Sequence, residues 1–385
     1  MNNKKKILFI VTRGGSLGGV QIHILDILKD LLKKDIETMV CLGDICKYEQ
    51  AKVLEESPFI KNLEKLGIKY FPIRTLKHEI NPIGDFKSIL ELIKTIKNFK
   101  PNLICLHSTK AGILGRIAAK ITSTPAIYTI HGWCFSTKKH FLINYIYFLI
   151  EKFAYFITDK FIVISDYDLN FAVNKGFNEK KMIKIHNSRN FKINSRKDVE
   201  KNNKIVNIIS VARFEAQKDH ITLLKSLNMI KNNKKWRCTL LGDGPKINQV
   251  KYLAKEFGLQ DRVIFKGFID NVGSYLSDSD IFVLSTNWEG LPITLIEAAA
   301  HGLPIISTDV GGCPEVVYHG LNGFIYPFKS HKHLSYFLKE LIKKPELMKK
   351  MSQSSKLVYD RKFLFKNFIK KTYEVYNSTS MSLNL

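Results

Sequence analysis

The chain has 385 residues, of which 45% are hydrophobic and 11% aromatic, so it is long enough for two globular domains and is not dominated by disorder. Its formal net charge of +25 predicts attraction to an anionic partner, which could be nucleic acid, a membrane surface or a phosphorylated small molecule. The six cysteines are scattered and lack CxxC spacing, which favours a reduced, cytosolic protein without structural zinc.

The N-terminal apolar run, Ile7 to Val11, is too short for a signal peptide and is interpreted as a first strand. Short β-branched runs then alternate with helical stretches. We expect strands near residues 7–12, 36–42, 68–73, 102–107, 126–130 and 161–164, and a second series near 205–211, 236–241, 262–266, 281–284, 304–307 and 323–326. This alternation predicts an α/β fold with two Rossmann-like, doubly wound parallel sheets.

The polar segment Asn187 to Lys204 lacks sustained periodicity and is interpreted as an interdomain linker. The predicted organisation is therefore an N-terminal domain over 1–186, a linker over 187–204, and a C-terminal domain over 205–360. Residues 361–385 carry apolar side chains at helical spacing, so we expect a C-terminal helix and tail that dock back on the N-terminal domain.

The segment Phe141 to Thr158 is almost wholly apolar, is interrupted by Glu151 and Lys152, and has lysines on both flanks. It lacks the roughly 18 uninterrupted apolar residues of a spanning helix. Two interpretations stay open: a helix buried between the sheet and its neighbours, which we favour, and a basic-flanked helix that rests on a membrane interface.

Ligands of parallel α/β sheets bind beyond the carboxyl ends of the strands, so the residues just after each strand are the candidates for a site. After the first strand, four glycines precede a helix (Gly14, Gly15, Gly18 and Gly19). Their spacing is not that of a nicotinamide or flavin fingerprint, but such a turn can approach a phosphate or a sugar. His107 and His131 follow the fourth and fifth strands, and two histidines at one edge favour contact with a polar ligand over simple turn residues.

In the second half, Arg213 and Lys218 follow a strand and precede a helix, where they could neutralise a diphosphate without a metal. The alternative is an exposed, salt-bridged loop. Two D-x-D sequences, at Asp166 and Asp278, resemble metal-binding patterns. We do not expect a metal site at either sequence. Asp166 is placed to cap a helix, and Asp280 comes directly before a strand, at the end that faces away from the expected ligand site.

Glu297 is a chargeable residue in a strongly apolar helix that we expect to begin near Pro292, and Glu289 lies in the loop before it. A buried carboxylate needs hydrogen-bond donors. The hydroxyls of a ligand could supply them, and a basic side chain is the alternative.

Together these residues resemble the retaining nucleotide-sugar glycosyltransferases of family 4, which have the GT-B fold of two Rossmann-like domains facing across a cleft. The blocks that carry the resemblance include "VARFEAQKD", "LLGDGP", "VIFKGFIDNV", "EGLPITLIEAAAHGLP" and, in the first domain, "GGVQIHILDIL" and "TIHGWCF". The Glu-x7-Glu spacing of Glu289 and Glu297 is the most specific element. The likeness spans roughly Lys6 to Phe328, and the blocks of the first domain are similar to bacterial enzymes that build capsule, exopolysaccharide or lipopolysaccharide.

The resemblance implies that the second domain binds the nucleotide-sugar and the first binds the acceptor. Catalytic roles would fall to Glu289 at the donor sugar, Arg213 and Lys218 at the diphosphate, and His131. Donor binding would also involve Glu297 at the ribose, with Gly242, Gly267, Phe268, Gly290, Leu291 and Pro292. The acceptor and phosphate loop would comprise Gly18, Gly19, Gln21, His107 and Lys110.

Such enzymes retain the anomeric configuration and need no divalent metal, so we expect no cofactor besides the nucleotide-sugar co-substrate. The expected partner is a saccharide or polyprenyl-diphosphate-linked acceptor, with no nucleic acid. We expect the protein in the cytoplasm, and our hypothesis is that its positive charge and the segment Phe141 to Thr158 bring it to the inner face of the cell membrane. Two departures affect the hinge and the acceptor side: Ser188 stands where the family often has Gly, and Gln21 where many relatives have Glu.

Three other functions fit part of the pattern. A GT-B sugar-nucleotide epimerase would need no acceptor but would not be expected to carry the "EGLPITLIE" block. A glycoside hydrolase would use two carboxylates but has no use for Arg213 and Lys218. A basic protein that binds nucleic acid or a membrane surface would not bind nucleotide-sugars.

Overall fold

The computed structural model describes residues 4–15, 17–43, 57–135, 141–191, 193, 205–269, 271–380, 382–383 and 385. The chain forms two compact units. Unit 1 contains Met1–Asn187 and Phe365–Leu385, and unit 2 contains Ser188–Leu364. Most of the segment that we interpreted as a linker, residues 192 and 194–204, lies outside the described residues.

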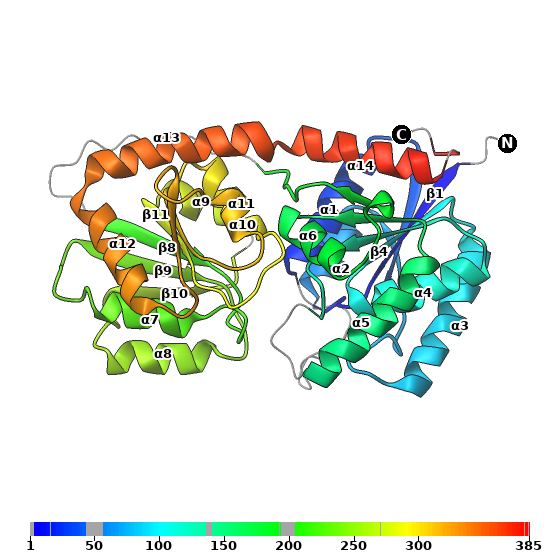
Figure 1. The fold of residues 1–385 in the computed structure, drawn as a ribbon, viewed down its shortest axis with the longest axis horizontal. Coiled ribbons are helices and arrows are strands. Elements are labelled where there is room, and N and C mark those ends of the chain that lie inside the picture. Colours follow the sequence, from blue (N-terminus) through cyan, green and yellow to red (C-terminus); the bar gives the residue numbers. More distant parts are fainter. Residues whose placement is uncertain are drawn as a thin grey trace. The chain divides into compact units, whose positions relative to one another are not determined.

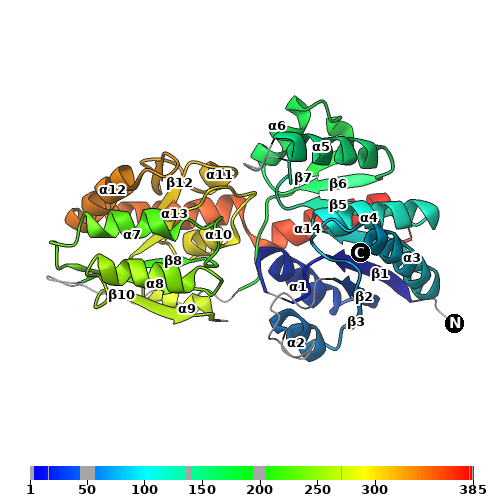
Figure 2. The same cartoon turned by 90° about the horizontal axis from the view of Figure 1, so that it is seen from below.

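Unit 1 is built on a seven-stranded parallel sheet with the order β3-β2-β1-β4-β5-β6-β7, which Figure 2 shows from β3 to β7. Its strands are β1 (Lys5–Val11), β2 (Ile36–Leu42), β3 (Lys69–Pro72), β4 (Leu103–His107), β5 (Ala126–Ile130), β6 (Lys160–Val163) and β7 (Met182–Lys184). The six strands expected in this half are confirmed, and β7 was not predicted. It is a three-residue edge strand, which is too short to give a period-2 signal.

Helices cover both faces of this sheet. They are α1 (Gly19–Leu31), α2 (Pro58–Lys65), α3 (Pro82–Phe99), α4 (Thr109–Ile121), α5 (Phe141–Phe156), α6 (Asp166–Asn174) and α14 (Phe365–Thr379), with the short 3-10 helix η2 (Glu179–Lys181). Successive strand side chains point to opposite faces. Accordingly, Phe9 packs in the core under α1, α2 and α14, whereas Leu8 and Ile10 pack in the core under α3 and α4.

The C-terminal helix α14, drawn in red in Figure 1, is part of the fold of unit 1. Phe368, Ile369 and Tyr376 are buried in the same core as β1 and β4. Lys160 Nζ, at the start of β6, donates to Ser378 Oγ at 2.7 Å. The last helix therefore completes one of the two layers of unit 1.

Unit 2 has a six-stranded parallel sheet with the order β10-β9-β8-β11-β12-β13. Its strands are β8 (Val206–Val211), β9 (Trp236–Leu241), β10 (Val263–Gly267), β11 (Ile281–Leu284), β12 (Ile305–Thr308) and β13 (Gly323–Tyr326). Its helices are α7 (His220–Asn228), α8 (Ile247–Glu256), α9 (Val272–Ser277), α10 (Ile293–Ala300), α11 (Cys313–Val316), α12 (His331–Lys343) and α13 (Pro345–Lys362). The six strands expected here are all confirmed, and both units have the predicted doubly wound α/β form.

Helix α5 corrects one interpretation of the sequence. We favoured burial of this segment, but most of its large apolar side chains are exposed, including Phe141, Phe153 and Phe156. Its buried side instead carries Glu151, Ala154 and Tyr155. Among the described residues, no helix combines the length and the apolarity that crossing a bilayer requires.

Candidate functional site

The loops at the carboxyl edge of the unit 2 sheet are tied to one another by backbone hydrogen bonds. Phe214 N, after β8, donates to Asp243 O, after β9, at 2.9 Å, and Asn287 N donates to Gln217 O at 2.7 Å. Gly242 has φ +136°, and a Cβ added there would lie 2.1 Å from Ala212 O. This position therefore requires glycine, because only glycine allows the β9 loop to lie so close to the loop that carries Arg213.

Glu289 and Lys218, assigned to the donor sugar and the diphosphate, are brought together and form an ion pair. Thr286 Oγ1 donates to Glu289 Oε1 at 2.8 Å, and Gln217 Nε2 donates to Trp288 O at 2.7 Å. Both charged side chains are largely buried, with 16% of Lys218 and 8% of Glu289 exposed. Burial and the neighbouring Glu289 carboxylate raise the pKa of the Cys313 thiol. This part of the edge therefore contains a localised, oriented pair of opposite charges.

Arg213 lies in the same loop as Lys218 but has a different partner. Its guanidinium is 3.2 Å from Glu215 Oε1, and about a third of the side chain (35%) is exposed. Gly267 ends β10 with φ +71°, and the following Phe268 is 47% exposed. A half-buried cation, Arg213, and an exposed aromatic ring, Phe268, thus lie in two loops at this edge, where a nucleotide could use both.

Glu297 has the type of partner that we rated as the alternative. Its buried carboxylate forms an ion pair with Arg189, at the start of unit 2. Helix α10 starts at Ile293, one residue later than expected, with Pro292 in the N-cap position. His301 Nδ1 donates to Glu297 O at 2.8 Å. Sequence reasoning missed Arg189, because nothing local connects two residues 108 positions apart.

The loop that carries Glu289 is also packed against the loop after β12. Gly312 N donates to Gly290 O at 2.7 Å. A Cβ on Gly311, which has φ +55°, would lie 1.9 Å from Glu289 O. Leu291 and Pro292 are buried in the same turn. Gly290, Leu291 and Pro292 therefore position the Glu289 loop, whatever else they contact.

In unit 1, the glycine-rich turn is held by Gln21. Its Oε1 accepts from Gly18 N at 3.0 Å, and its Nε2 donates to Arg13 O at 2.7 Å. Gly18 is the N-cap residue of α1, and Gly19 is the first residue of the helix. A Gln side chain can make both contacts because it offers a donor and an acceptor, whereas an ionised Glu can only accept.

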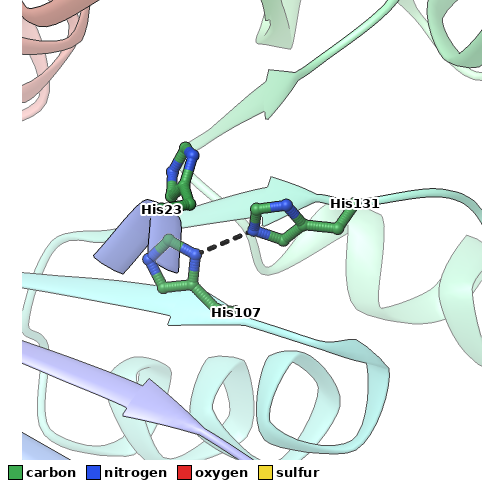
Figure 3. A group of neighbouring side chains, drawn as sticks. All are labelled: His23, His107 and His131. Carbon is green, nitrogen blue, oxygen red and sulfur yellow. Dashed lines mark hydrogen bonds between the residues drawn. The ribbon is translucent and has the colours of Figure 1, made fainter. Parts of the chain in front are cut away.

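His107 and His131 lie together with a third histidine, His23, which sequence reasoning missed (Figure 3). His107 Nδ1 and His131 Nε2 are 3.1 Å apart, and the His23 and His131 ring centroids are 4.8 Å apart. His23 comes from α1, so only the packing of α1 on the sheet brings it to the strand ends. Lys110 is directed elsewhere, to Asp85 Oδ2 at 2.6 Å.

Desolvation favours the neutral form of these histidines, of which His23 and His107 are buried and His131 is partly buried. Desolvation lowers the pKa of His23 to about 4, and it lowers the pKa values of His107 and His131 well below the usual value. His23 Nδ1 lies 2.8 Å from Asn187 Oδ1. Since an amide oxygen only accepts, the His23 proton is on Nδ1. One ring nitrogen from each histidine lies within 4.8 Å of the others. Imidazole nitrogens are also a ligand type that zinc prefers.

Aspartates of both D-x-D sequences contact neighbouring groups of the protein. Ser165, not Asp166, caps α6, with Ser165 Oγ accepting from Asp168 N at 3.0 Å. Asp166 is instead 2.5 Å from Lys184 Nζ. Asp280 Oδ2 accepts from Asn207 N at 2.8 Å, at the start of β8 and away from the carboxyl edge. Our interpretation of Asp166 as the cap was wrong by one residue.

The described geometry defines a GT-B protein with its charged loops at the carboxyl edge of the second sheet. Residues 17–190 match the protein family "Glycosyltransferase Family 4", and residues 191–358 match the family "Glycosyl transferases group 1". The chain belongs to the family 4 glycosyltransferases.

The chain is similar to curated bacterial enzymes. It is 27% identical to the Escherichia coli UDP-Gal:alpha-D-GlcNAc-diphosphoundecaprenol alpha-1,3-galactosyltransferase, over 70% of this chain and 74% of the relative. It is also 27% identical to the Staphylococcus aureus capsular polysaccharide glycosyltransferase CapM, over 83% and 87% of the two chains. The crystal structure of Anabaena HepE in complex with UDP has the same fold, with a TM-score of 0.78, 20% identity, and coverage of 97% of this chain and 100% of HepE.

Proposed function

We propose that this glycosyltransferase moves a hexose-type sugar from a nucleotide-sugar to a lipid-linked saccharide acceptor during the synthesis of a bacterial surface polysaccharide, with retention of configuration and without a divalent metal. The observation that carries the proposal is the Lys218–Glu289 ion pair, held between the loops after β8 and β11. The activity for which the E. coli relative is named supports a lipid-linked acceptor, and the UDP in HepE supports a nucleotide donor.

In the proposed reaction, the bond between the anomeric carbon and the diphosphate oxygen breaks, and negative charge builds on that oxygen. Arg213 and Lys218 stabilise this charge, and this is the main catalytic contribution that we assign to the chain. Glu289 binds the sugar hydroxyls, and its charge keeps the Lys218 ammonium in place before the donor arrives. The acceptor oxygen then bonds to the face that the diphosphate left, and its proton passes to the departing phosphate.

The remaining residues are proposed to bind and orient the substrates. Glu297 binds the ribose hydroxyls, and Gly267 and Phe268 contact the base. The neutral imidazole of His131 faces the donor sugar, and the Gly18–Gly19 turn lines the acceptor side. We place the enzyme in the cytoplasm, peripheral to the inner face of the cell membrane, because its proposed acceptor is carried by a lipid.

The first test is a thermal-shift screen of nucleotide-sugars in the presence of EDTA. A true donor raises the Tm in proportion to ln(1 + [L]/Kd). Transfer to a lipid-linked acceptor, followed by NMR of the product anomer, then checks retention. Loss of activity in EDTA that zinc or magnesium restores would overturn metal independence. Epimerised donor or free sugar as the main product would favour the epimerase or the hydrolase.

The catalytic assignment is tested by Arg213→Ala. We expect kcat to fall by about 10²–10³-fold, as for loss of a donor that stabilises transition-state charge. The matched control is Arg237→Ala, which removes an exposed arginine of β9 outside these loops. Near wild-type turnover in Arg213→Ala would remove this residue from the mechanism.

A further inference from the structure

Helix α5 of unit 1 presents an apolar surface to the outside. Its exposed large side chains are Phe141, Leu142, Ile143, Tyr145, Ile146, Leu149, Ile150, Phe153 and Phe156. At about 3.6 residues per turn, these positions form one continuous side of the helix. We call this set the α5 outer face. Monomeric proteins rarely expose so large a contiguous apolar patch, and those that do mostly use it for binding.

The side of α5 that packs on unit 1 is the more polar one. Glu151, which is 1% exposed, lies 2.6 Å from the guanidinium of the fully buried Arg116. Arg116 Nε also donates to Gly112 O at 2.8 Å, and its guanidinium stacks over the Tyr128 ring at 4.5 Å. Polar contacts of this kind fix the rotation of the helix about its axis. A surface helix normally buries its apolar side and exposes its polar side, and α5 does the reverse. The packing of unit 1 alone therefore does not explain the α5 outer face.

The charges around the α5 outer face are mainly positive. Glu151 is the one acidic residue in the α5 sequence, and the buried ion pair neutralises it. Lys152 Nζ lies over the Phe177 ring at 5.0 Å. Lys181 Nζ donates to Thr158 O at 2.9 Å, at the C-terminal end of the helix. Lys175 and Lys180 are exposed between α6 and β7, as is Glu179, and Asp159 is exposed just after α5.

We propose that the α5 outer face is the membrane-docking surface of this protein and inserts into the interfacial region of an anionic bilayer. A helix of 16 residues is about 24 Å long, so it would lie in the plane of the membrane. Its apolar side chains would enter the boundary between headgroups and acyl chains, and the adjacent lysines would contact lipid phosphates. This inference names the partner for the proposed peripheral location and rests on that part of the proposed function.

A bilayer fits this face better than a second copy of the chain does. Two copies joined through α5 would bring their lysine-rich borders together, and each chain has a formal net charge of +25. Like charges at an interface oppose association, whereas an anionic lipid surface attracts the same lysines.

The test is sedimentation of the full-length protein with vesicles of phosphatidylcholine alone or mixed with phosphatidylglycerol. We expect binding to the mixed vesicles, and weaker binding as salt is raised. The test variant carries Ile146→Gln, Leu149→Gln and Phe153→Gln at the centre of the face. Its affinity for the mixed vesicles should fall at least about tenfold, since three apolar side chains no longer leave water.

The matched control carries Met229→Gln, Leu321→Gln and Leu357→Gln, which replace three apolar residues of unit 2 with similar exposure. We expect it to bind vesicles as the wild type does. A second readout uses the Phe153→Trp variant, whose added fluorescence should shift to shorter wavelength on vesicles and be quenched by brominated lipid. The Leu357→Trp variant should show neither change. Equal loss of binding in both triple variants, or no spectral shift in the Phe153→Trp variant on vesicles, overturns the proposal.

The outcomes also separate this inference from the proposed reaction. Stabilisation of the test variant by the nucleotide-sugar should match that of the wild type, because α5 contributes no proposed donor residue. If the wild-type protein does not bind the mixed vesicles, both the docking surface and the peripheral location are wrong. The transfer reaction is tested separately by its own assay. If sedimentation velocity without vesicles shows a dimer that the test variant loses, the face is a subunit interface and the proposal is wrong.

Discussion

At the scale of single residues, the charged groups proposed to bind the donor already have protein partners. Lys218 pairs with Glu289, and Arg189 pairs with Glu297. A buried charge needs such a partner, because an unpaired one costs several kcal/mol. Each ion pair therefore has two roles in the proposal: it keeps a charge stable in the fold, and it leaves that charge where a ligand can share it.

For Glu297, these two roles can be separated by substitution. Glu297→Ala removes both the carboxylate and the ion pair, and we expect the Kd for the nucleotide-sugar to rise about 10–100-fold, as for a lost hydrogen bond to a charged group. Arg189→Met removes the pair but keeps the carboxylate, so affinity should fall less. Calorimetric titration of both variants checks this. Equal losses would mean that Glu297 acts only through Arg189.

The histidine cluster predicts a pH dependence of stability. Because burial lowers the pKa of His23 to about 4, from an unfolded value of about 6.5, the unfolded chain binds the extra proton between these limits. This contribution to stability is fully present above about pH 6.5 and is lost as the pH falls toward about 4. One such histidine should cost about 1–1.5 kcal/mol between pH ~7.5 and pH ~5.5.

The measurement is the change in Tm between these two pH values. His23→Gln should show a smaller change than the wild type, even if its Tm is lower at both values, because the difference cancels a constant packing loss. His333→Gln, at an exposed position of unit 2, should keep the wild-type difference. An unchanged difference in His23→Gln would show that the cluster is not kept neutral by burial.

At the scale of elements, the β9 loop sets the position of the loop that carries Arg213. Gly242→Ala would place a methyl group 2.1 Å from Ala212 O, so one of the two loops must move. We expect loss of stability and a weaker response to the nucleotide-sugar in thermal-shift titrations. Gly258→Ala is the control, because Gly258 has φ +67° but nothing within 4 Å of the added Cβ. It should cost about 1–2 kcal/mol, because alanine is strained at this φ, and leave donor binding intact.

The elements also show what sequence can and cannot predict. Buried parallel strands are recognisable because they are short β-branched runs, so twelve of the strands were found, but β7, with three residues, was not. The residues at strand ends were found for the same reason. Arg189 and His23 were missed because their partners, Glu297 and the two histidines, are distant in the sequence. The rotation of α5 was also beyond reach, since a helix that is apolar on most sides does not reveal which side is buried.

At the scale of the whole molecule, unit 2 contains the residues proposed to bind the base, the ribose and the diphosphate, including Arg213, Lys218 and Glu297. A nucleotide alone should then order loops of unit 2 without altering unit 1. UDP, a nucleoside diphosphate, is the probe for the proposed nucleotide site. Loops that gain contacts with a ligand open less often, and their amides exchange more slowly.

Hydrogen exchange with UDP should therefore slow in peptides covering 212–219, 285–292 and 309–313, which follow β8, β11 and β12. Peptides from β1 and α1 should be unaffected. Uridine is the matched control: it lacks the diphosphate that Arg213 and Lys218 are proposed to bind, so it should protect 212–219 much less than UDP does. Protection by UDP of the glycine-rich turn of unit 1, with none in the three loops of unit 2, would reverse the assignment of donor and acceptor to the two units.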